Sequence, residues 1–171
     1  MSGDNGPWVL DSYALLAYLG AEPGHQRVEE LLRAGAAGRA ELYLCLINYG
    51  EVLYIIERER GLTQTQLAIA AIDQLPLQVV EADRELTFEA AHIKAGFALA
   101  CADCFAVALA RRIRGVVVTG DPEFREVSQL VAVEWLPTAD AGPCAGANCS
   151  PQVPVQGPCL SFPLEPGIIC V

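Results

Sequence analysis

The first 137 residues alternate short apolar, often β-branched runs with longer stretches in which apolar residues recur every three or four positions. A short apolar run is typical of a buried strand, and the three-to-four-residue spacing is typical of a helix with one buried side. The pattern predicts strands at residues 8–10, 42–46, 77–80, 115–118 and 131–135. It predicts helices at residues 13–19, 25–36, 48–60, 64–75, 84–95, 101–112 and 122–128.

The predicted strands are almost entirely apolar, and helices separate them along the chain. Strands of this kind occur in mostly parallel sheets that helices cover on both faces. We therefore expect an α/β fold, a three-layer α/β/α sandwich around a sheet of about five strands.

The composition changes abruptly near Pro137. Residues 138–171 hold six of the 11 prolines and four of the 7 cysteines, contain no Lys or Arg, and show neither helical nor strand periodicity. We therefore expect two parts, a folded domain at 1–137 and a Pro- and Cys-rich tail at 138–171 outside the fold.

Size and charge narrow the possible functions. The chain has 171 residues, is 53% hydrophobic and carries a net charge of −10. It lacks a run of about 20 apolar residues and a basic signal segment, so we expect a soluble, cytoplasmic protein with no membrane contact. The acidic balance argues against a broad, sequence-blind grip on nucleic acid, which depends on Lys and Arg.

The 7 cysteines do not suggest a disulfide scaffold, because their number is odd and three of them lie in apolar segments. Cys101 and Cys104 have the spacing of a redox or zinc motif. They lie in an apolar helical stretch, however, with no second pair inside the predicted domain. We interpret them, with Cys45, as reduced core thiols.

Four acidic residues stand alone in otherwise apolar surroundings. Asp11 and Asp121 each follow a predicted strand, at the edge where open α/β sheets bind ligands. Glu51 and Asp103 are each the only charge in a long apolar part of a predicted helix. Asp11 and Asp121 have the alternative role of helix caps, whereas an acid inside a helix with no basic neighbour is unusual.

A desolvated carboxylate needs a positive or hydrogen-bonding partner, and none of the four segments supplies a Lys or Arg. If the acids converge, two carboxylates about 4 Å apart repel by about 4 kcal/mol at an effective dielectric of about 20. They must then share protons or hold a cation. Carboxylates with several waters are the ligands of Mg²⁺ or Mn²⁺, so we expect one of these ions as cofactor.

The segments around the four acids resemble the four motifs of PIN-domain ribonucleases, specifically the VapC-type toxins of bacterial toxin–antitoxin pairs. The resemblance covers about residues 8–136, in the right order and spacing. The segments are VLDSYALL around Asp11, INYGEVLY around Glu51, LACADCFAVALA around Asp103 and VVTGDPEF around Asp121.

The resemblance implies a metal-dependent endoribonuclease that leaves a 5′-phosphate, a cognate antitoxin protein as partner, and a homodimer. The implied site comprises Asp11, Glu51, Asp103 and Asp121 as the acidic pocket and metal ligands, with Ser12 and Thr119 as supporting hydroxyls. Arg112 is a candidate contact to RNA, although a cation at the end of its predicted helix also suits the helix dipole.

Other α/β classes fit less well. A phosphoacceptor receiver domain needs paired acids after its first strand and a Lys after its last, and a haloacid-dehalogenase-type phosphatase needs an Asp where Tyr13 stands. The alternative that stays open is a PIN-like module that binds RNA or protein without cutting.

Overall fold

The computed structural model describes residues 6–138. The predicted tail at 138–171 falls almost wholly outside the described residues, so its separation from the domain stays a prediction. The strands are β1 (Pro7–Leu10), β2 (Glu41–Cys45), β3 (Gln78–Val80), β4 (Val116–Thr119) and β5 (Ala132–Trp135). The helices are α1 (Ser12–Leu19), α2 (His25–Ala36), α3 (Leu46–Arg60), α4 (Leu62–Ile72), α5 (Arg84–Gly96), α6 (Cys101–Ile113) and the 3-10 helix η1 (Pro122–Val127).

The strands form one five-stranded sheet in the order β3-β2-β1-β4-β5, and every neighbouring pair is parallel. The central strand β1 pairs with β4 so that Val9 lies beside Val117 and Leu10 lies beside Val118. From β1 the chain builds outward through β2 and β3, then returns to place β4 and β5 on the other side of β1. The strand order therefore reverses between β1 and β4, next to each other at the centre of the sheet.

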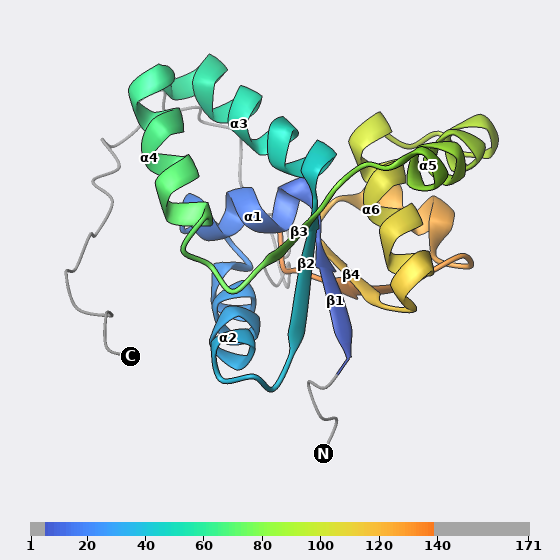
Figure 1. The fold of residues 1–171 in the computed structure, drawn as a ribbon, viewed down its shortest axis with the longest axis horizontal. Helices are drawn as coiled ribbons and strands as arrows, with labels where there is room; N and C mark the ends of the chain where they lie inside the picture. The colour runs from blue at the N-terminus through green and yellow to red at the C-terminus, as the bar shows by residue number, and fades with distance from the viewer. Residues whose placement is uncertain (1–5, 139–171) are drawn as a thin grey trace, which may run out of the picture. The chain divides into compact units, whose positions relative to one another are not determined.

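Helices cover both faces of the sheet, as the sequence predicts (Figure 1). Successive side chains of a strand point to opposite faces. Val9 and Val117 accordingly pack in the core formed with α5, α6 and η1, whereas Leu10 and Val118 pack against α1 and α2. A third cluster joins β2 and α1 to α3 and α4. The three-layer α/β/α sandwich is confirmed.

Helix α6 is the most deeply enclosed helix of the described part, because every residue from 102 to 110 is buried. An apolar surface all around a helix requires cover on all sides, here from α5, α3 and the sheet. In residues 6–138 no single helix has the length and apolarity to cross a membrane; α5 and α6 meet that test only together, with a bend of 119° between them.

Three expectations need correction in detail. The last helical segment is a 3-10 helix, because Asp121 and Pro122 fix a short turn rather than a long amphipathic run. Strand β2 ends at Cys45, and α3 begins at Leu46. Cys45 and Cys104 are buried as expected, but Cys101 is exposed because it is the first residue of α6.

Candidate acidic site at the carboxyl edge of the sheet

Two of the four acids lie where the strand order reverses. Asp11 directly follows β1, and Asp121 comes two residues after β4. These strands are neighbours, and the chain leaves them toward opposite sides of the sheet. A crevice at the carboxyl ends of such strands is the usual ligand site of open α/β sheets.

Asp11 uses one carboxylate oxygen for structure and leaves the other uncommitted. Its Oδ1 accepts a hydrogen bond of 2.8 Å from the Ala14 N–H and so caps α1. Its Oδ2 is buried and accepts no hydrogen bond of normal geometry within residues 6–138. Burial raises the pKa of Asp11 to about 7, although the nearby Thr119 hydroxyl and the Ala14 N–H act in the opposite direction. The cap role and a ligand role are therefore compatible in this residue.

Asp103 lies in the first turn of α6 and is only 6% exposed. Burial raises its pKa to about 8, and the negative charges of Asp11, Asp121 and Glu51 add to the rise. In the described part of the chain no group donates a hydrogen bond to it. The four acids, from four separate segments, thus lie within electrostatic reach of one another.

Glu51 is held by a short network from α1 and α3. The Ser12 hydroxyl donates to Glu51 Oε2 at 2.6 Å, and Asn48 Nδ2 donates to Ser12 Oγ at 3.2 Å. Asn48 is fully buried, and its Oδ1 has no hydrogen-bond partner among the described residues. Asn48 begins the predicted helix at 48–60, where an Asn is typical of a cap, so its sequence context does not mark it as a site residue.

Asp121 resembles Asp11 in its local structure. Its Oδ1 accepts from the Glu123 N–H at 2.8 Å, and its own N–H donates to Thr119 Oγ1 at 3.0 Å. Gly120 lets this turn lie against α1, since a Cβ there would come within 2.2 Å of Tyr13 Cε1. Thr119 therefore closes the turn that positions Asp121, and its hydroxyl also lies near Asp11.

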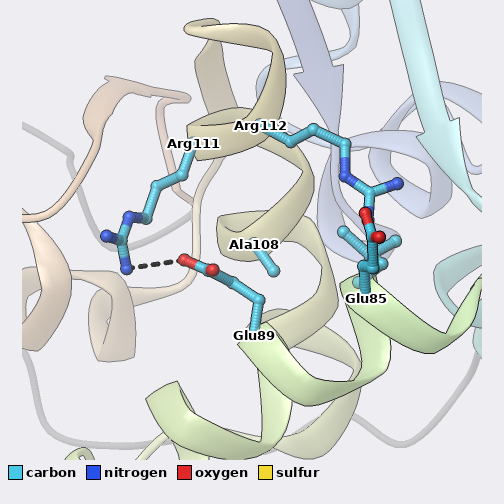
Figure 2. A pocket seen from close by; sticks show the side chains of 6 residues that line it. Glu85, Glu89, Ala108, Arg111 and Arg112 are labelled. Carbon is cyan, nitrogen blue, oxygen red and sulfur yellow. Dashed lines mark ion pairs between the residues drawn. The ribbon is translucent and has the colours of Figure 1, made fainter.

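Arg112 lies elsewhere, nine residues beyond Asp103 on α6, which is about 13 Å along a helix axis. Its guanidinium donates to both carboxylate oxygens of Asp83, at 2.7 and 2.8 Å. This pair, with the Leu86 N–H, holds the pKa of Asp83 well below its usual value. Arg112 borders a pocket between α5 and α6, where Figure 2 shows Arg111 reaching toward Glu89. The structure does not bring Arg112 into the acidic site, and its contact with RNA stays a prediction.

The acidic site offers hard oxygen donors without a preformed cage. In residues 6–138 no group of three or more Asp, Glu, His or Cys side chains is arranged to hold a metal ion. The unpaired Asp11 Oδ2 and the Asp103 carboxylate nevertheless lack a positive partner. Such a donor set fits a divalent cation that keeps part of its water shell, as Mg²⁺ usually does.

The profile of the PIN-domain family matches residues 8–130. This segment includes all four acids, β1 from its second residue, and the whole of β2, β3 and β4. The chain belongs to the PIN-domain family. Proteins of this family are nucleases that generally need a divalent metal ion.

Solved structures with the same fold support this assignment. A VapBC2 complex from Rickettsia felis bound to a fragment of promoter DNA matches with a TM-score of 0.61 at 15% identity, over 77% of this chain and 99% of that one. The toxin VapC20 from Mycobacterium tuberculosis, described as cleaving the sarcin-ricin loop, matches with a TM-score of 0.59 at 17% identity, over 76% and 99%. A DNA-bound VapBC from Salmonella typhimurium matches with a TM-score of 0.58 at 20% identity, over 75% and 96%. No curated protein matches the sequence significantly.

Proposed function

We propose that this PIN domain is a metal-dependent endoribonuclease and the toxin of a type II toxin–antitoxin pair. The observation that carries the proposal is the convergence of Asp11, Glu51, Asp103 and Asp121 beside the strand-order reversal. They leave one buried carboxylate oxygen without a partner. The VapC and VapBC structures of the same fold favour RNA as substrate and an antitoxin as partner.

In this proposal Asp11 and Asp103 are the principal ligands of Mg²⁺ or Mn²⁺, and Asp121 and Glu51 complete the site or orient the attacking water. When bound there, such an ion would lower the pKa of a water and neutralise charge on the phosphate. The Ser12 hydroxyl fixes Glu51, and the Thr119 hydroxyl fixes the turn before Asp121. The caps at Asp11 and Asp121 hold each carboxylate by one oxygen and leave its second oxygen free for a ligand.

The arrangement needs no histidine. His92 is exposed on α5, and His25 Nδ1 donates a hydrogen bond to the Glu22 carbonyl oxygen at the start of α2. Proton transfer in the site therefore falls to carboxylates and water, with the roles of Glu51 and Asp121 as acid or base left to experiment.

The test compares RNA cleavage by the full chain in Mg²⁺ or Mn²⁺, in chelator, and in Asp11→Asn. This substitution removes the charge but keeps a side-chain oxygen that caps α1. The matched control is Asp83→Asn, a second helix cap, which lies at the start of α5 outside the acidic site. We expect metal-dependent cutting that Asp11→Asn abolishes and Asp83→Asn retains.

Absence of cutting with either metal would overturn the nuclease proposal and favour the non-cutting RNA- or protein-binding module. Equal loss in Asp11→Asn and Asp83→Asn would show a stability effect instead of a site effect.

A chain that ends at residue 137 tests the domain boundary in the same assay, and we expect it to cut as the full chain does.

A further inference from the structure

The first turn of α6 carries a pair of thiols on either side of Asp103. Cys101 is the first residue of the helix and is exposed, whereas Cys104 is fully buried. Cys104 N donates to the Ala100 carbonyl at 3.2 Å in the first bond of the helix. A thiol open to solvent and a sheltered thiol thus lie one helical turn apart.

The spacing suits a bond between the two sulfurs. Residues three apart on a helix have Cβ atoms about 5–6 Å apart, and a disulfide needs about 3.5–4.5 Å. The missing distance of about 0.5–2.5 Å must come from local movement. The first turn of a helix is its least constrained part, because its N–H groups lack intrahelical partners. The cap residue Ala100 adds no side-chain hydrogen bond that would hold this turn.

The two cysteines also differ from the third described thiol. Cys45 ends β2 and is fully buried in the core that packs against α6. It has no exposed cysteine one turn away. An oxidant in solution therefore reaches Cys101 first. Cys104 is the nearest cysteine in the sequence, and its sulfur can complete a disulfide with Cys101.

We propose that Cys101 and Cys104 form a reversible disulfide, and that its closure displaces Asp103 and switches off the acidic site. The second half rests on the proposed nuclease function. Asp103 lies between the two cysteines in the turn that must tighten, and Ala102 and Asp103 are both buried. Because α5, α3 and the sheet pack closely against α6, this turn has little room to tighten without moving the buried carboxylate.

The reaction is a thiol–disulfide exchange with a low-molecular-weight disulfide. The Cys101 sulfur attacks one sulfur of the oxidant, and the first small thiol leaves with a proton. The Cys104 sulfur then attacks the Cys101 sulfur of the mixed disulfide, and the second small thiol leaves. The protein loses two electrons and two protons, and the oxidant becomes two thiols.

Mass spectrometry tests the disulfide separately from any activity. Trypsin cuts after Lys94 and Arg111, and the peptide 95–111 contains Cys101 and Cys104 but no other cysteine. The full chain is treated with oxidised glutathione, and its free thiols are then blocked. We expect this peptide to carry no blocking group and to be lighter than the dithiol peptide by two hydrogen atoms. Dithiothreitol should restore the mass of the dithiol peptide. A peptide that carries glutathione on Cys101 and a blocked Cys104 overturns the proposal, as does a peptide with both thiols blocked.

A second measurement tests the effect on the site. We expect oxidation to weaken the rise in Tm that Mn²⁺ causes and to lower RNA cleavage at least about tenfold. Both effects should be absent in Cys101→Ser, which keeps the reduced behaviour. If the disulfide forms but metal binding and cleavage are unchanged, the switch is wrong although the bond is real. If neither oxidised nor reduced protein cuts RNA, the nuclease proposal fails. The mass of the peptide 95–111 and the rise in Tm with Mn²⁺ then still test the disulfide and its effect on the acidic site.

Discussion

At the scale of single residues, the site is built from carboxylates that the folded protein holds at an energetic cost. Asp103 is buried beside other acids and has no hydrogen-bond donor within the described residues. Such a group lowers stability unless a cation binds it, and its retention is typical of a functional site. The cost and the function are thus two consequences of one arrangement.

Asp103→Asn should therefore separate stability from activity. In chelator at about pH 8 we expect the variant to be more stable by about 0.5–2 kcal/mol, because a buried charge is removed at constant shape. RNA cleavage should fall at least about 100-fold. Thermal unfolding and a cleavage assay measure the two effects. The control is Glu123→Gln, an exposed acid near the site, for which both changes should be small. A less stable Asp103→Asn would contradict the interpretation.

Asn48 provides a residue-scale test of positioning. Asn48→Ala removes the donor to Ser12 Oγ, and we expect Glu51 to lose its orientation. Replacement of such a supporting residue typically lowers metal affinity or activity by about 10–100-fold. The Mn²⁺ concentration for half-maximal cleavage should rise, a readout that a loss of stability alone does not change. Tyr54→Phe is the matched control, because its contact with Glu51 is exposed and 3.5 Å long. Equal behaviour of the two variants would rule out a positioning role for Asn48.

At the scale of elements, the sequence predicts the secondary structure of each segment better than it predicts the contacts between segments. The five strands and the helices at 25–36 and 84–95 match the pattern closely. A strand covered on both faces is a short apolar run, and a helix buried on one side has a readable period. The pair of Arg112 with Asp83 joins residues 29 apart, and no local pattern indicates it. The same holds for Asn48, whose partner Ser12 lies 36 residues away. The acids were detectable because each lacked a local partner, which is itself a property of the sequence.

The contact of β1 with β4 depends on a glycine. A Cβ on Gly115 would lie 2.6 Å from the Pro7 carbonyl oxygen, a backbone atom that cannot turn away. We expect Gly115→Ala to lower the free energy of unfolding by about 1–3 kcal/mol, the usual range for overpacking. Chemical denaturation measures it. Gly50→Ala is the control, because open space surrounds this exposed position inside α3 and the change should stabilise by about 0.5–1 kcal/mol. Destabilisation of similar size in both variants would argue against a clash at the β1–β4 contact.

At the scale of the whole domain, the sheet order determines which acids meet. A pattern of apolar strands and helices predicts a parallel sheet but leaves the order of its strands open. The order β3-β2-β1-β4-β5 places the ends of β1 and β4 side by side, although more than 100 residues separate Asp11 from Asp121. The sequence singles out the four acids one by one, and the fold supplies the reason that they lie within electrostatic reach of one another.

The pH dependence of stability tests the acidic site as a unit. Burial raises the pKa values of Asp11 and Asp103 from 3.8 to about 7 and about 8. The folded protein thus holds these protons more tightly than the unfolded chain does. Their stabilising contribution is complete below the unfolded pKa and is lost as pH rises through the folded values. In chelator we expect Tm to fall between about pH 5 and pH 9, and Asp83, whose pKa is lowered, does not titrate in this range.

Divalent metal should reverse this trend, because a cation binds carboxylates only after their protons leave. We expect the rise in Tm caused by Mg²⁺ or Mn²⁺ to grow with pH from about 6 to 9, and RNA cleavage to increase over the same range. Asp103→Asn should flatten both curves, because the variant lacks the group with the higher pKa. Differential scanning fluorimetry across pH, with and without metal, measures the coupling. A Tm in chelator that is independent of pH would mean that the buried acids carry their charges without cost, and the physical basis for a cation among them would be lost.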